Sequence, residues 1–311
     1  MKKLDIVGFG LSTLDVVMVM KDMPNWEYGG WVSEFVFQNG GMAATAVGAA
    51  ARLGAGAGFI GTIGNDEIAD LKRKYLTNLG VDTSRMIKRE RPEGQVSFVY
   101  VHEGTGERVF APNPRFIEGP PVAQEIDKEY LTSAEYLHMD ALYLEPSIAA
   151  AEAMKAAKKQ VAVDLGTSTG MEVVPEVKRL VELTDILITG TGFSQALTKE
   201  TDLVAAMRKT LSFGPRLVVE TQGAKGCVTV SKDEEFETPS FPITPVNTTN
   251  AGDVFHGAYY FGLIKGWELK RCAVFASAAA ALLCTKLSGD RIPTYDQVVG
   301  FLKERGAEWK P

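Results

Sequence analysis

The chain has 311 residues, of which 45% are hydrophobic and 23% are charged. This ordinary globular composition allows one large domain or two smaller ones and a sizeable core. The formal net charge of −6 at pH 7 gives no general attraction to nucleic acid. We also expect no membrane contact, because no segment has the apolar length needed to span a bilayer and the first residues lack the apolar run of a signal peptide.

The three cysteines are widely spaced along the chain and form no CxxC or Cys/His cluster. They are Cys227, Cys272 and Cys284. A zinc site is therefore not expected. A sparse and odd number of cysteines is typical of reduced thiols, and we expect a cytoplasmic protein.

In chain order, short apolar runs alternate with runs of helical periodicity. Residues 4–10 predict a strand that ends in glycines, and residues 40–54 predict a glycine turn followed by an alanine-rich helix. Residues 95–113 partly alternate apolar and polar positions around the stretch EGTGE, which is typical of a β-hairpin. Further strands are predicted at 56–64, 135–141, 161–166, 185–190 and 216–223, and further helices at 66–80, 146–160, 175–184, 202–214, 251–266, 269–287 and 294–306.

The repeated strand–helix units imply a mainly parallel sheet covered by helices. The hairpin, together with residues 16–37, predicts a small β insertion on that body. Ligands of such sheets usually bind beyond the carboxyl ends of the strands. The loops at those ends are therefore where we look for functional residues.

Residues 247–258, NTTNAGDVFHGA, run from a polar loop into a helix whose first N–H groups form an anion site. Ala251 and Gly252 are small enough to let a phosphate approach the backbone. Asp253 could accept a proton from a substrate hydroxyl that attacks the phosphoryl group. The alternative is that Asp253 only complements the helix dipole, and this stretch alone supports both interpretations equally.

Residues 218–227, VVETQGAKGC, contain candidate nucleotide-binding positions. Thr221, Gly223 and Gly226 would let phosphates or ribose meet the backbone, with Lys225 as a nearby point charge. The alternative is a plain β-turn. Short glycine spacings are weak evidence, so the stretch by itself favours the turn.

Two further loops carry candidate positions for a small polar ligand. Gly40 and Gly41 would allow close backbone approach, or they would only make a turn with positive φ before the helix. Asp15 could bind two sugar hydroxyls with its two oxygens, or it could be an exposed turn residue. In each loop the plainer alternative is favoured when the loop is taken alone.

Together and in this order, the four loops resemble the ribokinase-like carbohydrate kinases of the PfkB family over nearly the whole chain. NTTNAGDVFHGA resembles the signature usually written DTTGAGDxFxGA, and GGMAATAVGAAARLG, TQGAKG and SGDRIPTYDQVVGFL resemble other parts of the family pattern. The resemblance implies a ribokinase-like three-layer α/β/α fold with a mainly parallel central sheet. It also implies a single domain over residues 1–311, with a small β lid inserted from about 14–38 and 94–112.

The resemblance implies transfer of the ATP γ-phosphate, with Mg²⁺, to a hydroxyl of a sugar or sugar derivative. By position Asp253 would be the general base, and the backbone amides of Asn250, Ala251, Gly252 and Asp253 would form the anion hole. The nucleotide would be bound by Thr221, Gly223, Lys225, Gly226 and Ser277, and the acceptor by Asp15, Gly40, Gly41, Thr45, Asp140 and Arg108. The lid would exclude water, and a homodimer through the lid is implied.

Four places depart from the family pattern. Thr45 stands where the family often has Asn, and Asn250 stands where it has Gly. Asn247 replaces an Asp whose carboxylate is often linked to a monovalent cation. Residues 189–191, Thr-Gly-Thr, stand where an Asn-Glu motif helps to organise Mg²⁺. The sequence therefore leaves the metal ligands unassigned and weakens the case for a monovalent cation.

The acceptor is not identified by the sequence, and three alternatives to a neutral sugar stay open. Phe37, Phe110 and Trp31 would offer aromatic surface to the base of a nucleoside. Arg108 and Arg115 could meet an anionic sugar such as a sugar acid, phosphate or sulfonate. The lost Asn-Glu motif allows a degenerate kinase that binds sugar or nucleotide as a regulator, whereas the retained aspartate of the second signature argues against one.

Overall fold

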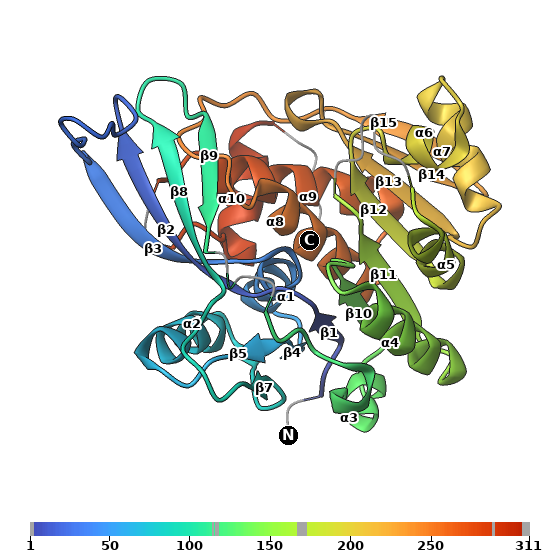
Figure 1. The fold of residues 1–311 in the computed structure, drawn as a ribbon. Helices are drawn as coiled ribbons and strands as arrows, with labels where there is room; N and C mark the ends of the chain where they lie inside the picture. The colour runs from blue at the N-terminus through green and yellow to red at the C-terminus, as the bar shows by residue number, and fades with distance from the viewer. Residues whose placement is uncertain (1–2, 114, 116–117, 167–172, 288–289, 307–311) are drawn as a thin grey trace.

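The computed structural model describes residues 3–306 except 114, 116–117, 167–172 and 288–289. Nine strands of this part form one central sheet: β1 (Ile6–Phe9), β4 (Ala57–Ile60), β6 (Val81–Asp82), β10 (Tyr136–Met139), β11 (Gln160–Asp164), β12 (Ile186–Gly190), β13 (Leu217–Thr221), β14 (Cys227–Ser231) and β15 (Glu235–Thr238). Their order is β15-β14-β13-β12-β11-β10-β1-β4-β6 (Figure 1). All neighbours pair in parallel except β13–β14 and β14–β15.

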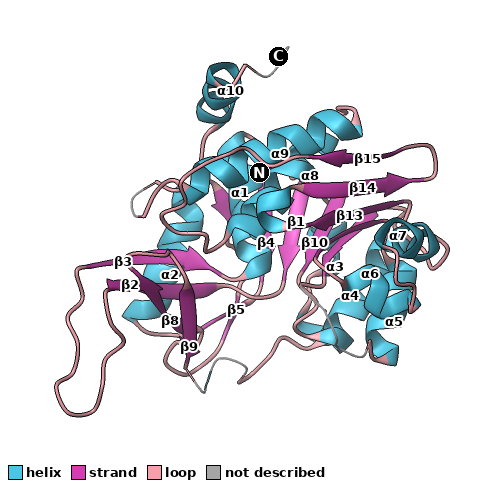
Figure 2. Ribbon diagram, turned by 90° about the horizontal axis from the view of Figure 1, so that it is seen from above, coloured by secondary structure: helices cyan, strands magenta, loops and turns pink. Residues whose placement is uncertain are grey.

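Helices cover both faces of the central sheet (Figure 2). One face carries α1 (Met42–Leu53), α2 (Glu67–Asn78), α8 (Ala251–Ile264), α9 (Leu269–Cys284) and α10 (Tyr295–Glu304). The other carries α3 (Lys128–Thr132), α4 (Leu144–Ala156), α5 (Pro175–Leu183), α6 (Phe193–Thr198) and α7 (Leu203–Leu211). The predicted three-layer α/β/α fold with a mainly parallel sheet is therefore confirmed.

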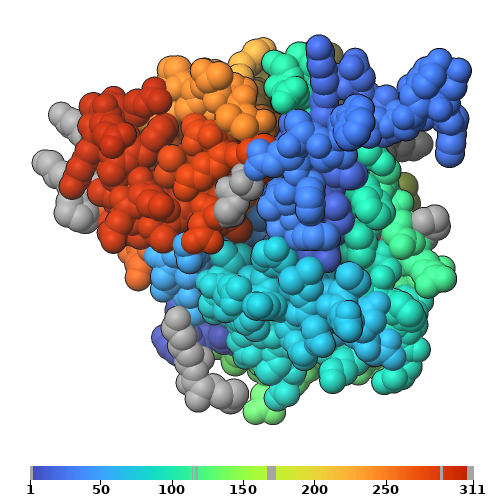
Figure 3. Space-filling view, turned by 90° about the vertical axis from the view of Figure 1, so that its left-hand side faces the viewer, coloured from blue at the N-terminus to red at the C-terminus, as the bar shows by residue number. Residues whose placement is uncertain are grey.

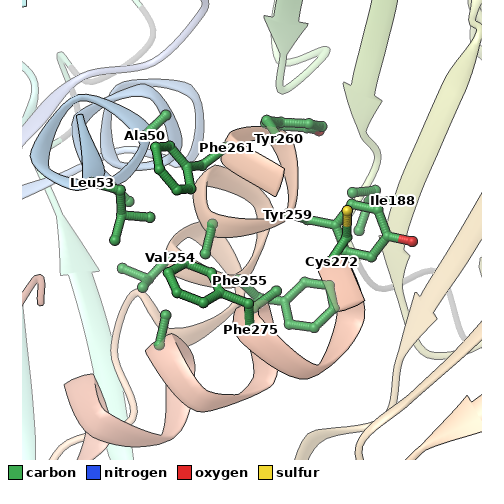
Figure 4. Packing of buried hydrophobic residues seen from close by; sticks show 14 of the residues in the cluster. Ala50, Leu53, Ile188, Val254, Phe255, Tyr259, Tyr260, Phe261, Cys272 and Phe275 are labelled. Carbon is green, nitrogen blue, oxygen red and sulfur yellow. The ribbon is translucent and has the colours of Figure 1, made fainter. Parts of the chain in front are cut away.

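The core of the first face fixes the position of α8. Figure 4 shows Val254 and Phe255 of α8 beside Phe275 of α9, all in one buried cluster. Gly257 lets α8 approach α1 closely, because a Cβ at this position would collide with the carbonyl oxygen of Ala46. Apolar burial on several sides therefore fixes α8, and with it the start of the helix at the sheet edge.

A second, four-stranded sheet, called the small sheet below, stands beside this body. It consists of β2 (Thr13–Met20), β3 (Glu34–Gly40), β8 (Val96–His102) and β9 (Arg108–Pro112), in the order β3-β2-β8-β9. Both β2–β3 and the expected hairpin β8–β9 are antiparallel, whereas β2 and β8 pair in parallel. In Figure 3 the segment that joins β2 to β3, in blue, projects from the body, as the loop between these strands also does in Figure 2.

One side of the small sheet is packed and the other is open. Val17, Val19, Val99 and Val101 form a compact apolar cluster of their own. The remaining described elements are the two-stranded sheet of β5 (Thr62–Ile63) and β7 (Ile87–Lys88) and the short 3₁₀ segments η2 (Ala123–Glu125) and η3 (Gly223–Lys225). Among the described residues, no helix is long and apolar enough to cross a membrane.

Candidate active site

Two cavities open beside the N-terminus of α8, where the parallel strands end. The first has a volume of about 400 Å³ and is called the polar cavity, because its wall includes the charged or ionisable side chains of Asp15, Arg108, Asp164, Asp253 and His256. The second has a volume of about 380 Å³ and is called the apolar cavity after most of its wall. Both walls include Thr221, Thr248, Ala251 and Gly252. The two cavities therefore adjoin at the first turn of α8.

Asp253 lies in that first turn and lines the polar cavity. Asn250 precedes the helix in a left-handed conformation, with φ 66° and ψ 11°, which Asn tolerates better than most residues. Ala251 N donates to Thr248 O at 3.3 Å, whereas the amides of Gly252 and Asp253 have no carbonyl one turn earlier in the helix. Apart from its chain neighbours and its own helix backbone, a Cβ at Gly252 would meet no heavy atom of the described residues within 4 Å. The turn therefore presents backbone donors and the positive end of the helix dipole to open space.

The surroundings of Asp253 raise the pKa of its carboxyl group to about 7. Burial is the largest cause, and the negative charge of Asp164 raises the pKa further, whereas the charge of His256 lowers it. A carboxylate that only complemented the helix dipole would instead have its pKa lowered. A pKa near neutrality suits a group that accepts a proton and releases it again.

Asp15 places a second carboxylate in the wall of the polar cavity, from β2 of the small sheet. It is 4% exposed, and Thr13 Oγ1 donates to its Oδ1 at 2.6 Å. Burial raises the pKa of Asp15 to about 6, although the hydrogen bonds from Thr13 and Gln38 and the charge of Arg291 act against burial. Gly40 allows β3 to lie against this carboxylate, because a Cβ there would collide with Oδ2.

A buried guanidinium anchors the loop that leads into α8. Arg291 is 5% exposed, and its Nη2 donates to Asn247 O at 2.7 Å and to Thr249 O at 3.1 Å. Its Nε donates to Lys286 O at 3.0 Å, and its Nη1 donates to Gln38 Oε1 at 2.8 Å. Burial lowers the pKa of Arg291 to about 10, so the group is still charged at neutral pH. One cation thus ties this loop to β3.

The apolar cavity combines an apolar slot with a few polar groups. Thr221 ends β13, Gly223 begins η3 with open space around it, and Ser277 of α9 lines the cavity from the helix side. The apolar part of the wall includes Phe241, Pro242, Ile243, Pro245 and Phe255. A slot of this kind suits a flat, largely apolar ring such as a nucleotide base.

Residues 3–294 match the family described as pfkB family carbohydrate kinase. This chain belongs to the pfkB family of carbohydrate kinases. The resemblance expected from the four loops is therefore confirmed, and the protein is an ATP-dependent sugar kinase.

Relatives of this pfkB kinase include sugar kinases of bacteria and archaea. It is 25% identical over 327 residues to 5-dehydro-2-deoxygluconokinase of Clostridium beijerinckii, covering 99% of this chain and 95% of that protein. It is 25% identical to the ATP-dependent ribose-1-phosphate kinase of Halopiger xanaduensis, covering 96% and 98%. A ribokinase II from E. coli, solved in complex with ATP and Mg²⁺, has a TM-score of 0.82 at 22% identity and covers 97% of this chain and 99% of that one.

Most of the residues predicted from the sequence come together around the two cavities. Around the first turn of α8, the wall of the polar cavity contains Asn250, Ala251, Gly252 and Asp253. The remaining predicted residues in that wall are Asp15, Gly41 and Arg108, and those in the wall of the apolar cavity are Thr221, Gly223, Gly226 and Ser277. The four loops that are far apart in sequence thus meet at one edge of the central sheet.

Four predicted residues lie outside both walls. Lys225 is exposed at the end of η3, and Gly40 packs beneath Asp15. Thr45 is buried in α1, where its Oγ1 accepts a hydrogen bond from Asn39 Nδ2 at 3.1 Å. Asp140 supports the site from below: its Oδ2 accepts the amides of Leu11 at 2.7 Å and Ala43 at 3.3 Å, and its Oδ1 accepts that of Leu142 at 3.1 Å.

Sequence reasoning missed Asp164, His256 and Arg291 as parts of the site. Asp164 could have been proposed from the sequence, since it lies near the carboxyl end of a predicted parallel strand. His256 lies in the helix predicted at 251–266, and its ring lines the polar cavity. Nothing in the local pattern around Arg291 points to a buried anchor.

Metal ligands remain unassigned. Among the described residues, no group of three or more His, Cys, Asp or Glu side chains could hold a metal ion. Thr191, in the place of the missing Asn-Glu motif, donates its hydroxyl to Thr221 O at 3.0 Å. The described side chains thus form no cage for Mg²⁺, an ion that proteins often bind through substrate phosphates and water.

Proposed function

We propose that this kinase binds ATP in the apolar cavity and a sugar or sugar derivative in the polar cavity, and that the γ-phosphoryl group crosses between them at the first turn of α8. Asp253 acts as the general base, and the anion hole lies at residues 250–253, with the amides of Gly252 and Asp253 as its donors. The observation that carries the proposal is that both cavities share Ala251 and Gly252, directly beside Asp253. Thr221, Gly223, Gly226 and Ser277 would contact the nucleotide.

In the proposed reaction, the acceptor hydroxyl gives its proton to Asp253 while its oxygen attacks the γ-phosphorus. The bond between that phosphorus and the bridging oxygen of ADP breaks. The amides of Gly252 and Asp253 stabilise the charge on the phosphoryl oxygens, in a site built mainly for positioning and electrostatics. Mg²⁺, carried on the ATP phosphates, would neutralise part of their charge.

We further propose an anionic sugar as the acceptor. Arg108 brings a guanidinium to the wall of the polar cavity, and its Nη1 donates to Thr248 Oγ1 at 2.6 Å. The names of two relatives, a gluconokinase and a ribose-1-phosphate kinase, both refer to acidic substrates. A guanidinium can bind a carboxylate or phosphate through two parallel hydrogen bonds.

A nucleoside acceptor would need aromatic residues around its base, but the three candidates do not assemble around the polar cavity. Phe110 lies in its wall, whereas Phe37 is outside it and Trp31 is 94% exposed. This distribution favours a sugar. The near-neutral pKa of the Asp253 carboxyl group favours an enzyme over a ligand-binding regulator.

We propose that no monovalent cation is needed beside α8. The carbonyl oxygens of Asn247, Thr249 and Lys286 already accept hydrogen bonds from the guanidinium of Arg291. A second cation would not fit among oxygens that a buried positive group occupies, because the two charges would repel each other.

The small sheet would act as a lid and pair with a second copy of the chain. Its open side and the segment between β2 and β3 expose several aromatic side chains, namely Trp26, Tyr28, Trp31, Phe35 and Phe98. A large exposed apolar patch commonly marks an interaction site. Sedimentation of the wild type and of the double variant Trp26→Ser, Trp31→Ser tests this: we expect a dimer that the double variant loses, and a monomeric wild type would contradict pairing.

We also infer a cytoplasmic enzyme, since all three cysteines are unpaired and buried. The catalytic proposal is tested by incubating the protein with Mg-ATP and a panel of neutral sugars, sugar acids, sugar phosphates and nucleosides. Mass spectrometry of the product and the amount of ADP are measured together. We expect a phosphorylated acidic sugar in equal amount to ADP. Binding of sugar and nucleotide without any phosphorylated product would overturn the kinase mechanism.

A further inference from the structure

Both ring nitrogens of His256 face groups that can only accept hydrogen bonds. Nδ1 lies 2.6 Å from Gly252 O, and Nε2 lies 3.0 Å from Ile188 O. A neutral imidazole has one N–H and one bare lone pair, so one nitrogen would point its lone pair at a carbonyl oxygen. The imidazolium form donates from both nitrogens and satisfies both contacts. The geometry of the ring therefore requires the charged form.

A counter-charge lies beside the ring. Asp164 Oδ2 is 3.6 Å from His256 Nε2, and the two side chains are 7% and 3% exposed. Asp164 is itself fixed, because its Oδ1 accepts the amide of Gly166 at 2.7 Å. Burial acts to lower the pKa of His256, but the charge of Asp164 and the two carbonyl acceptors outweigh burial and raise it. A buried charge is tolerated when it is paired and hydrogen-bonded in this way.

The other titratable groups near the ring come from three elements. They are Asp253 and Tyr260 of α8, Asp164 of β11 and His138 of β10. Asp253 has the same sign as Asp164, so it also favours the imidazolium. His138 and Tyr260 are aromatic neighbours at centroid distances of 5.8 and 6.2 Å.

His138 shows what burial alone does to a histidine in this core. It is fully buried, and among the residues that the structure describes neither of its ring nitrogens has a hydrogen-bond partner. Burial, followed by the charge of nearby His256, lowers its pKa well below the usual value, so His138 is neutral. The two rings are neighbours. The carbonyls and the carboxylate around His256 explain why His256 is positively charged and His138 is neutral.

We propose that His256 is a positively charged positioning residue that favours the ionised form of Asp253 and holds the first turn of α8 through Gly252. The inference rests on the proposed role of Asp253 as the base. The imidazolium stabilises the nearby carboxylate of Asp253 electrostatically. It therefore opposes the rise in the pKa of Asp253 that burial and the charge of Asp164 cause. The Nδ1–H of His256 donates to the carbonyl oxygen of Gly252, and the amide of Gly252 belongs to the proposed anion hole.

The charge on His256 can be measured without any kinase assay. The chain has three histidines, so ¹⁵N-imidazole labelling gives a small set of signals that the variants His102→Gln and His138→Phe assign. We expect both nitrogens of His256 to show imidazolium shifts near pH 8, and His138 to show a neutral ring. A neutral His256 ring at that pH would overturn the proposal.

The effect on the base is measured by the pH dependence of kcat/KM. His256→Gln removes the charge, so the acid limb should move to higher pH by about one unit. His138→Phe is the matched control, because it changes a neighbouring buried ring that carries no charge, and its limb should stay in place. An unmoved limb in His256→Gln, with only a lower melting temperature, would show a purely structural role.

The two measurements separate this inference from the proposed function. If Asp253 is not the base, the wild-type acid limb near pH 7 will be missing while the imidazolium signal persists. If His256 is neutral, the imidazolium signal will be missing while the limb persists. Should His256→Gln fail to fold, the labelling experiment on the wild type still decides the charge.

Discussion

The α8 side of the polar cavity and the small sheet are built in different ways. Asp164 and His256 are almost fully buried and bonded to backbone groups, and α8 is packed against both α1 and α9. The small sheet has a compact apolar cluster, with four buried valines among the described residues, and exposes aromatic residues on its other side. A rigid wall suits chemistry that needs fixed geometry, whereas an exposed sheet can move and vary with the acceptor.

The largest effect is expected where the rigid wall carries the base. Asp253→Asn keeps the shape of the side chain but removes proton acceptance, so kcat should fall roughly 10²- to 10⁴-fold. ATP affinity, measured by calorimetry, should be retained because the apolar cavity is unchanged. Asp233→Asn, in an exposed turn, is the control. Full turnover by Asp253→Asn would show that the α8 side of the polar cavity does not carry the catalytic base.

The anchor of the rigid wall gives the next largest effect. Arg291→Met leaves the carbonyls of Asn247 and Thr249 without their donor and loosens the loop before α8. We expect a loss in kcat of about 10- to 100-fold, because small misplacements at a reacting centre are costly. Added guanidinium should restore part of the rate, and Arg179→Met, on the exposed surface, should behave as the wild type.

The same variant tests the cation proposal. The turnover of the wild type should be the same in potassium, sodium and Tris buffers, since Arg291 already carries the charge. Because Arg291→Met can also change stability, its melting temperature is measured in parallel with its rate in each buffer. A wild type that requires potassium would show that the guanidinium does not take the place of the ion.

A smaller effect is expected on the small sheet, where acceptor recognition is proposed. Arg108→Gln should raise KM for an acidic sugar about 10-fold and leave kcat nearly unchanged, because a charge-assisted hydrogen bond is lost in both ground and transition states. Arg115→Gln, outside the wall of the polar cavity, should leave KM as it is. A loss confined to kcat would instead place Arg108 in the chemical step.

The smallest effect concerns stability. The folded pKa of Asp253 is about 7, above the ordinary value of 3.8, so the stability contributed by this group is present below about pH 4 and lost as pH rises through 7. Asp253→Asn should therefore raise the melting temperature near pH 8 by about 2–6 °C and change it little near pH 4. A lower melting temperature near pH 8 would mean that the ionised carboxylate stabilises the fold.

Much of the fold follows from the sequence because strands, helices and their alternation are local patterns. The small sheet was predicted in part. Its hairpin is marked by EGTGE, but β2 begins at Thr13, before the predicted insertion, and pairs in parallel with β8, which is distant in sequence. Periodicity contains no information about which distant strand will be the neighbour.

The site shows the same limit at the level of single residues. Asp253 could be found because its loop and helix are contiguous in the chain. Asp140 also lies near the carboxyl end of a predicted strand, yet its carboxylate accepts hydrogen bonds from the backbone amides of Leu11 and Ala43. Arg291 and His256 act through backbone carbonyls of other segments, and such contacts leave no pattern in the sequence.

The central claim is that the carboxylate of Asp253 takes the proton of the acceptor. Its most direct test is the pH dependence of kcat/KM for the wild type and Asp253→Asn, with the same phosphorylated product measured in both. We predict that the wild-type rate falls as the pH drops below about 7, and that the residual rate of Asp253→Asn shows no such fall. An acid limb that persists unchanged in Asp253→Asn would contradict the account.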